Sequence, residues 1–107
     1  MKFDPGLATR VADALEQIGE RAIRQRNVFG GRGFMYGKHA FVIVGEDAII
    51  AKLTAADYAR ALTEPGVTPF APGGERPMGT WVVVDAEVIA DDPELIDWVR
   101  RALNAVR

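Results

Sequence analysis

The segment from residue 22 to residue 53 constrains the fold most, because four short runs of β-branched and aromatic residues are separated there by glycine-containing joints. Joints this short form hairpins, so the strands that they connect should be antiparallel neighbours. The run from Ala40 to Val44 is apolar at every position, which predicts a central strand covered at least in part on both faces. The predicted strands span residues 22–29, 34–36, 40–44 and 48–53, with joints at 30–33, 37–39 and 45–47.

Three amphipathic stretches surround this segment and predict helices. The first begins after Asp4, an N-cap followed by proline, and its apolar residues recur at steps of three and four to about Glu20. The second begins after Thr54 and should end at residues 64–66, where proline and glycine interrupt it. The third opens at residues 92–94, and its apolar stripe consists of Leu95, Trp98, Val99, Ala102, Leu103 and Val106.

The apolar stripes of these helices must be covered, and the sheet is the only large partner in the chain. Residues 80–84 supply a last predicted strand, after a proline-rich stretch at 65–77 that we expect to be an exposed loop. We therefore predict an α+β fold: a two-layer sandwich in which an antiparallel sheet of about five strands is flanked by helices, in the order α-β-β-β-β-α-β-α. The 107 residues, 49% of them apolar, suit a single domain with one core, spanning residues 1–107.

The side chains that hydrolases use as nucleophiles are missing. The chain has no Ser, no Cys and one His, so hydroxyl and thiol triads cannot be assembled. His39 falls in a predicted hairpin turn, where an exposed histidine without a chemical role is the favoured interpretation. The acidic cluster of Asp91, Asp92 and Glu94 stands at the start of a helix, which favours capping over cation binding. We predict no enzyme, no catalytic residue, no metal and no cofactor.

Charge and hydropathy argue against an exported protein, a membrane protein and a strong nucleic-acid binder. The first residues contain an acid and a proline where a signal peptide would have an apolar run, and no apolar stretch approaches the length that spans a bilayer. The absence of cysteine permits a reducing compartment. The net charge of −2 is low for a strong nucleic-acid binder. We expect a cytoplasmic protein that does not bind membranes.

One basic, glycine-rich region is the candidate binding surface. Successive glycines in the predicted turn 30–33 let backbone N–H groups converge on an anion, and an arginine fork would assist them. Nucleic acid could use the same patch, with Phe29 or Phe34 as a stacking surface. The alternatives are a tight turn that needs glycine for its backbone and a solvated basic edge with inward-facing aromatics. The candidate residues are Arg21, Arg24, Arg26, Gly30, Gly31 and Arg32.

A family resemblance follows from motifs in this region and near the C-terminal end. Residues 28–31 (Val-Phe-Gly-Gly) and the following hairpin resemble the Met-Phe-Gly-Gly signature of TfoX N-terminal domains, with Val28 in place of methionine. Residues 76–78 (Arg-Pro-Met) and the helix that opens at 91–95 and contains Trp98 follow in the same order. The resemblance implies an antiparallel sheet flanked by helices and a role in regulating genes for DNA uptake. The two-domain regulators of that family carry a second, helical domain after the N-terminal one. Because 107 residues leave no room for it, we expect a stand-alone N-terminal domain here.

Two classes of function remain after these exclusions. The first is a non-enzymatic regulatory module that binds a protein partner, or a second copy of itself, through an exposed edge of the sheet. The second is direct binding of nucleic acid or a small anion through the arginine-rich first strand and the turn at 30–33.

Overall fold

The sheet is the largest part of the computed structural model, which describes residues 2–107. Within that range six strands pair in the order β1-β2-β3-β4-β6-β5, and every pair is antiparallel. The first four strands pair consecutively, which confirms the predicted meander. The strands are β1 (Arg24–Val28), β2 (Gly31–Tyr36), β3 (His39–Val44), β4 (Ala48–Lys52), β5 (Val67–Pro69) and β6 (Trp81–Asp85).

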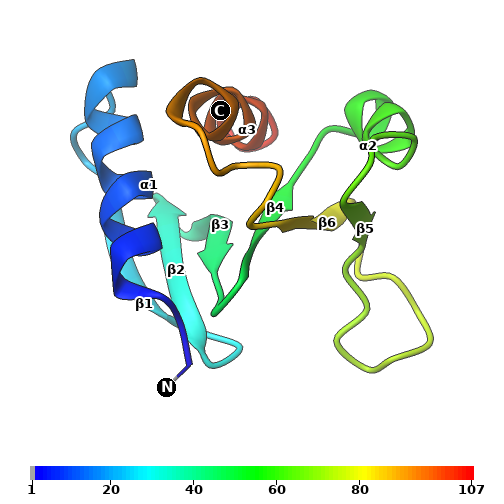
Figure 1. Cartoon of the computed structure of the whole chain (residues 1–107). Coiled ribbons are helices and arrows are strands. Elements are labelled where there is room, and N and C mark those ends of the chain that lie inside the picture. Colours follow the sequence, from blue (N-terminus) through cyan, green and yellow to red (C-terminus); the bar gives the residue numbers. More distant parts are fainter. Residues whose placement is uncertain (1) are drawn as a thin grey trace.

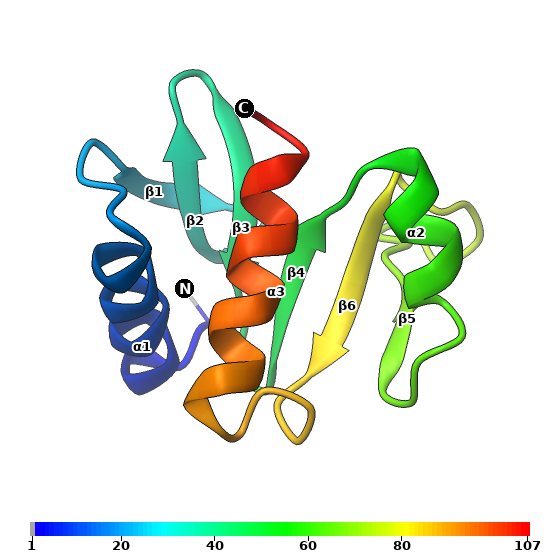
Figure 2. The same ribbon diagram turned by 90° about the horizontal axis from the view of Figure 1, so that it is seen from above.

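All three helices of the described range lie on one face of this sheet (Figure 1; Figure 2). They are α1 (Pro5–Ile18), α2 (Ala55–Ala61) and α3 (Asp92–Asn104). Their apolar stripes and the facing strands form one core, in which Val11, Val42 and Leu103 have no exposed surface. The predicted α+β sandwich is confirmed, with one strand more than expected.

The additional strand is β5, which lies within the stretch predicted to be an exposed loop. Val67 pairs with Val84 of β6 and is buried in the core, while the amide of Phe70 donates to the carbonyl of Trp81. A three-residue strand that ends in proline has no periodicity of its own. The strand β5 forms only because it pairs with β6. This pairing joins residues that are too far apart in the sequence for a local pattern to relate them.

The first hairpin differs from its prediction in the position of the turn. Phe29 and Gly30 both have positive φ values, 51° and 78°, and form a two-residue turn between Val28 and Gly31. Strand β2 therefore begins at Gly31 and not at Phe34, so most of the predicted glycine-rich joint belongs to a strand. At the next hairpin, His39 is exposed as expected, but it is the first residue of β3.

Helix capping agrees with the sequence at two of three sites. The Asp4 carboxylate accepts from the amides of Gly6 and Leu7, and the Thr54 hydroxyl accepts from the amide of Asp57. The acid expected to cap α3 is Asp92, but the N-cap is Asp91 and its side chain makes no capping hydrogen bond, so that part of the prediction is wrong; Asp92 and Glu94 lie in the first turn, as expected.

A charged network joins α2 to α3. The Arg101 guanidinium donates to both carboxylate oxygens of Asp57, at 2.9 Å each, and to both oxygens of Glu64, and it lies 3.8 Å from the centre of the Trp98 ring. The hydrogen bonds from Arg101 lower the pKa of Asp57 below its ordinary value, against burial, which raises it. Burial would lower the pKa of Arg101, but the hydrogen bonds to Asp57 and Glu64 outweigh burial and raise it. Both groups are therefore held in their charged forms.

Asp57→Asn should lower the free energy of unfolding near neutral pH by about 2 kcal/mol, because charge-assisted hydrogen bonds to Arg101 are lost. The folded-state pKa of Asp57 lies below its ordinary value of 3.8, so this stability is present above that pH and is lost as the pH falls through the folded pKa. Urea unfolding should show the difference between wild type and variant shrinking in acid. In the matched variant Asp97→Asn the change should stay within about 0.5 kcal/mol, because Asp97 is 3.9 Å from Arg101 and mostly exposed.

Candidate interaction surface

The three helices leave the opposite face of the sheet uncovered (Figure 1), and the strand register places a row of apolar side chains there. The register aligns Ile43 with Ile50 and Ile50 with Val83 across β3, β4 and β6. Met35 and Ile43 are buried but lie outside the core that the helices cover. We call the surface formed by Met35, Ile43, Ile50 and Val83 the helix-free face. No helix within residues 2–107 covers it.

The β1–β2 hairpin bends over the helix-free face because two glycines let it approach closely. A Cβ atom on Gly31 would lie 2.5 Å from the carbonyl oxygen of Val44 and 3.0 Å from a methyl group of Ile43. A Cβ atom on Gly33 would lie 2.6 Å from a methyl group of Val28. Figure 2 shows β1 running behind β2 at a steep angle. A side chain at Gly31 would push the hairpin away from β3, and a side chain at Gly33 would push β1 away from β2.

Phe29 is the exposed tip of this hairpin. Its side chain is 63% exposed, and it is the one large hydrophobic residue of the described chain with that degree of exposure. Its backbone lies in the left-handed region, which costs a residue with a Cβ atom about 1 kcal/mol or more. The Phe29 ring meets the Phe70 ring edge to face, with centroids 5.6 Å apart. Phe70 follows β5, so this contact brings together segments from the two ends of the sheet.

Arg24 and Arg26 lie on the same side of the sheet as this aromatic pair. Their register partners are Met35 and Gly33, so their side chains emerge on the helix-free face. Both are exposed, and within residues 2–107 neither forms an ion pair. Arg24 donates one hydrogen bond of 3.3 Å, to the carbonyl of Gly37.

The other predicted binding residues lie elsewhere. Arg32 pairs in register with Asn27 and Val44, so it emerges on the helix side, where its guanidinium lies 5.1 Å from the Phe3 ring centre. Arg21 lines a separate cavity of about 350 Å³ between α1 and β1. Gly30 is in the turn, and Gly31 is a buried strand residue. The structure thus brings Arg24 and Arg26 together and separates both from Arg21 and Arg32.

The two aromatic residues proposed for stacking, Phe29 and Phe34, differ in their exposure. Phe34 is 1% exposed and belongs to the helix-side core, whereas Phe29 is accessible. Phe70 was absent from the candidate set because it lies 41 positions from Phe29 in sequence. The consecutive apolar residues of β3, β4 and β6, which do not alternate with polar ones, could have indicated a second apolar face.

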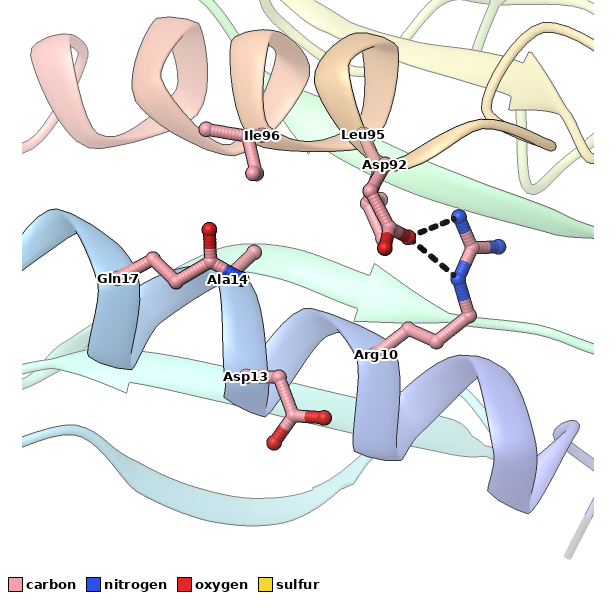
Figure 3. A pocket seen from close by; sticks show the side chains of 7 residues that line it. All are labelled: Arg10, Asp13, Ala14, Gln17, Asp92, Leu95 and Ile96. Carbon is pink, nitrogen blue, oxygen red and sulfur yellow. Dashed lines mark hydrogen bonds and ion pairs between the residues drawn. The ribbon is translucent and has the colours of Figure 1, made fainter.

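A crevice between α1 and α3 has a structural role. Figure 3 shows the Arg10 guanidinium reaching across it to Asp92, with hydrogen bonds of 3.0 and 3.3 Å. Arg10 also donates to the carbonyls of Ile89 and Ala90 just before α3. The remaining volume, about 80 Å³, is below the size of small-molecule sites. Arg10 and Asp92 therefore fasten α1 to the start of α3.

Residues 2–107 contain no cluster of three or more potential metal ligands. None of their helices has the length and apolar character needed to cross a bilayer.

Comparison with known families gives one match. The model of the TfoX N-terminal domain matches residues 13–106, which is nearly the whole chain. The chain belongs to the TfoX N-terminal domain family. Among curated proteins, none matches it. In this TfoX N-terminal domain the signature-like residues 28–31 form the end of β1, the exposed turn and the glycine that contacts β3. The motif thus has a defined physical task, which is to hold Phe29 at the tip of a hairpin pressed against β3.

Gly31→Ala should lower the free energy of unfolding by about 1–3 kcal/mol, because the added methyl group overlaps the backbone of β3. The matched variant Gly73→Ala meets nothing within 4 Å and should change stability by less than about 0.5 kcal/mol. Urea unfolding of both variants measures the difference. Equal stability of the two would show that the hairpin does not rest on β3.

Phe29→Asn should change the free energy of unfolding by less than about 1 kcal/mol, because the lost aromatic contact is offset by asparagine's tolerance of positive φ. Gly30→Ala in the same turn should cost about 1–2 kcal/mol, from backbone strain alone. Thermal and urea unfolding test both values. If Phe29→Asn lowered the free energy of unfolding by more than about 2 kcal/mol, the ring would be needed for folding and would not be available to a partner.

Proposed function

We propose that this TfoX N-terminal domain is a non-enzymatic regulatory module that binds a partner protein through Phe29 and the helix-free face. The observation that carries the proposal is the exposed, conformationally strained Phe29. A large aromatic residue held in water by a left-handed backbone has a cost in the isolated domain, and such strain concentrates at functional sites. Exposed aromatic anchors contribute most of the binding energy at many protein interfaces.

Burial supports a binding role over a catalytic one. Within residues 2–107 no polar or charged side chain is buried, and the two side chains with shifted pKa values, Asp57 and Arg101, neutralise each other in a structural ion pair. Catalytic acids and bases usually depend on partial burial beside a substrate cavity. Phe29 and the helix-free face are surface features, which suits a binding role.

Both edge strands of the sheet are poorly suited to pairing with a strand of a partner, so the proposed interface is a face of the sheet and not an edge. The edge strand β1 presents Arg24 and Arg26, and the edge strand β5 has three residues and ends in Pro69. Charged residues, short length and proline all discourage strand addition. We therefore place the partner on the helix-free face.

The regulatory setting comes from the family. We propose that the domain acts in a bacterial cytoplasm and controls genes for DNA uptake, as its resemblance to TfoX competence regulators implies. The partner would then be a component of that regulatory machinery.

Affinity purification from the native cell tests the proposed function. A tagged wild-type domain should retain at least one partner protein, and Phe29→Asn should reduce its recovery at least about fivefold, since losing an aromatic anchor costs more than 1 kcal/mol of binding. Arg100→Ala, which removes an exposed arginine of α3, is the matched control and should retain the partner. A partner recovered equally with both variants, or no partner at all, would contradict the proposal.

Direct nucleic-acid binding is the second candidate, because Arg24 and Arg26 share a side of the sheet with Phe29. Arginines that neutralise phosphates and an aromatic ring that stacks on bases are the usual elements of single-strand binding. Mobility shifts at increasing salt decide this question, because a phosphate-driven complex weakens steeply with salt. No shift at low salt would remove the candidate.

A further inference from the structure

We propose that the helix-free face binds an acidic amphipathic segment of the partner, whose apolar side chains pack on Phe29 and Phe70 and whose carboxylates pair with Arg24 and Arg26. This inference rests on the proposed function and names the chemistry of the partner.

Charge is distributed unevenly between the two sides of the sheet. Among the strand residues, the register places three cations, Arg24, Arg26 and Lys52, on the helix-free side, against one carboxylate, Asp85. The whole chain has a net charge of −2, so the strand residues of this side are basic within an acidic protein. Complementarity between opposite charges steers association and sets partner choice, which favours an acidic partner.

Three arginines on the helix side have carboxylate partners within the fold. Arg10 pairs with Asp92, Arg101 with Asp57 and Glu64, and Arg107 with Glu20. Within residues 2–107, Arg24 and Arg26 have no carboxylate partner, and their guanidinium groups remain available for bidentate pairing with carboxylates.

The apolar part of the site explains why the partner should be amphipathic. Phe29 and Phe70 form an edge-to-face pair, and Ile50 and Val83 lie half-buried on the same side of the sheet. Apolar side chains of an incoming segment would complete the burial of these residues. A segment with apolar residues on one side and carboxylates on the other satisfies both requirements at once.

A second copy of the chain fits this surface less well. An antiparallel pairing of β1 with β1 centred on Arg26 would place the two Arg26 side chains directly opposite each other, which is destabilising. Two helix-free faces brought together would also oppose their excess cations. A partner of opposite charge avoids both conflicts.

Fluorescence anisotropy with designed peptides tests the partner chemistry. The probe is a labelled helix-forming peptide of about 16 residues, with Leu at i, i+3, i+4 and i+7 positions and Glu at the others. It is compared with one peptide in which Gln replaces Glu and another in which Ser replaces Leu. The acidic Leu peptide should bind at least about tenfold more tightly than either, and about 0.5 M salt should weaken it several-fold.

Variants of the full chain locate the binding site. Arg24→Gln with Arg26→Gln should weaken binding of the acidic peptide at least about tenfold, and so should Phe29→Asn. The matched double variant, Arg60→Gln with Arg100→Gln, removes two exposed arginines from the helices and should leave binding within about twofold.

The possible contrary results distinguish failure of this inference from failure of the proposed function. Equal binding of the Gln and Glu peptides, or peptide binding that survives both the arginine and the Phe29 variants, would overturn this inference. Absence of peptide binding together with Phe29-dependent recovery of a native partner would overturn it while leaving the proposed function in place. Salt-sensitive binding of oligo-dT, competing with the peptide at Arg24 and Arg26, would assign the surface to nucleic acid instead.

Discussion

The exposed surface depends on two close approaches of the first hairpin: β2 lies against β3 at Gly31, and β1 lies against β2 at Gly33, where no side chain is present. With a methyl group at Gly31, 2.5 Å from the Val44 carbonyl oxygen, the hairpin would have to move away from β3. Phe29 would then lose its position beside Phe70, and Ile43 would lose the hairpin that lies against it. Two glycines thus determine the shape of one face of the sheet, while apolar packing of helices determines the other.

Much of the fold could be predicted from the sequence because it follows from local periodicity. The three helices, the four-strand meander and the two-layer arrangement each arise from repeating patterns within a single segment. Strand β5 could not be predicted in this way. Its three residues are stabilised by pairing with Val82–Val84 on a strand more than ten positions away, and Pro69 argues locally against a strand.

The candidate surface was harder to predict because it depends on register. A joint at 30–33 would have left Arg32 in a loop, free to join Arg24 and Arg26. The two-residue turn at Phe29 and Gly30 instead pairs Arg32 with Asn27, and strand alternation then sends Arg32 to the opposite face. Period-two spacing within β1 was sufficient to group Arg24 with Arg26. Phe70 required knowledge of how the two ends of the sheet meet, which no local pattern contains.

Arginines differ in this domain in whether neighbouring carboxylates pair with them. On the helix side, Arg101 is satisfied by Asp57 and Glu64 and stacks on Trp98, so its charge stabilises the junction of α2 and α3. On the other side, Arg24 and Arg26 emerge from an edge strand without acidic neighbours to pair with. A charge already paired within the fold has little attraction left for a ligand, whereas an arginine without a carboxylate partner can still pair with one. Pairing therefore distinguishes Arg101, which stabilises the fold, from Arg24 and Arg26, which lie on the surface proposed for binding.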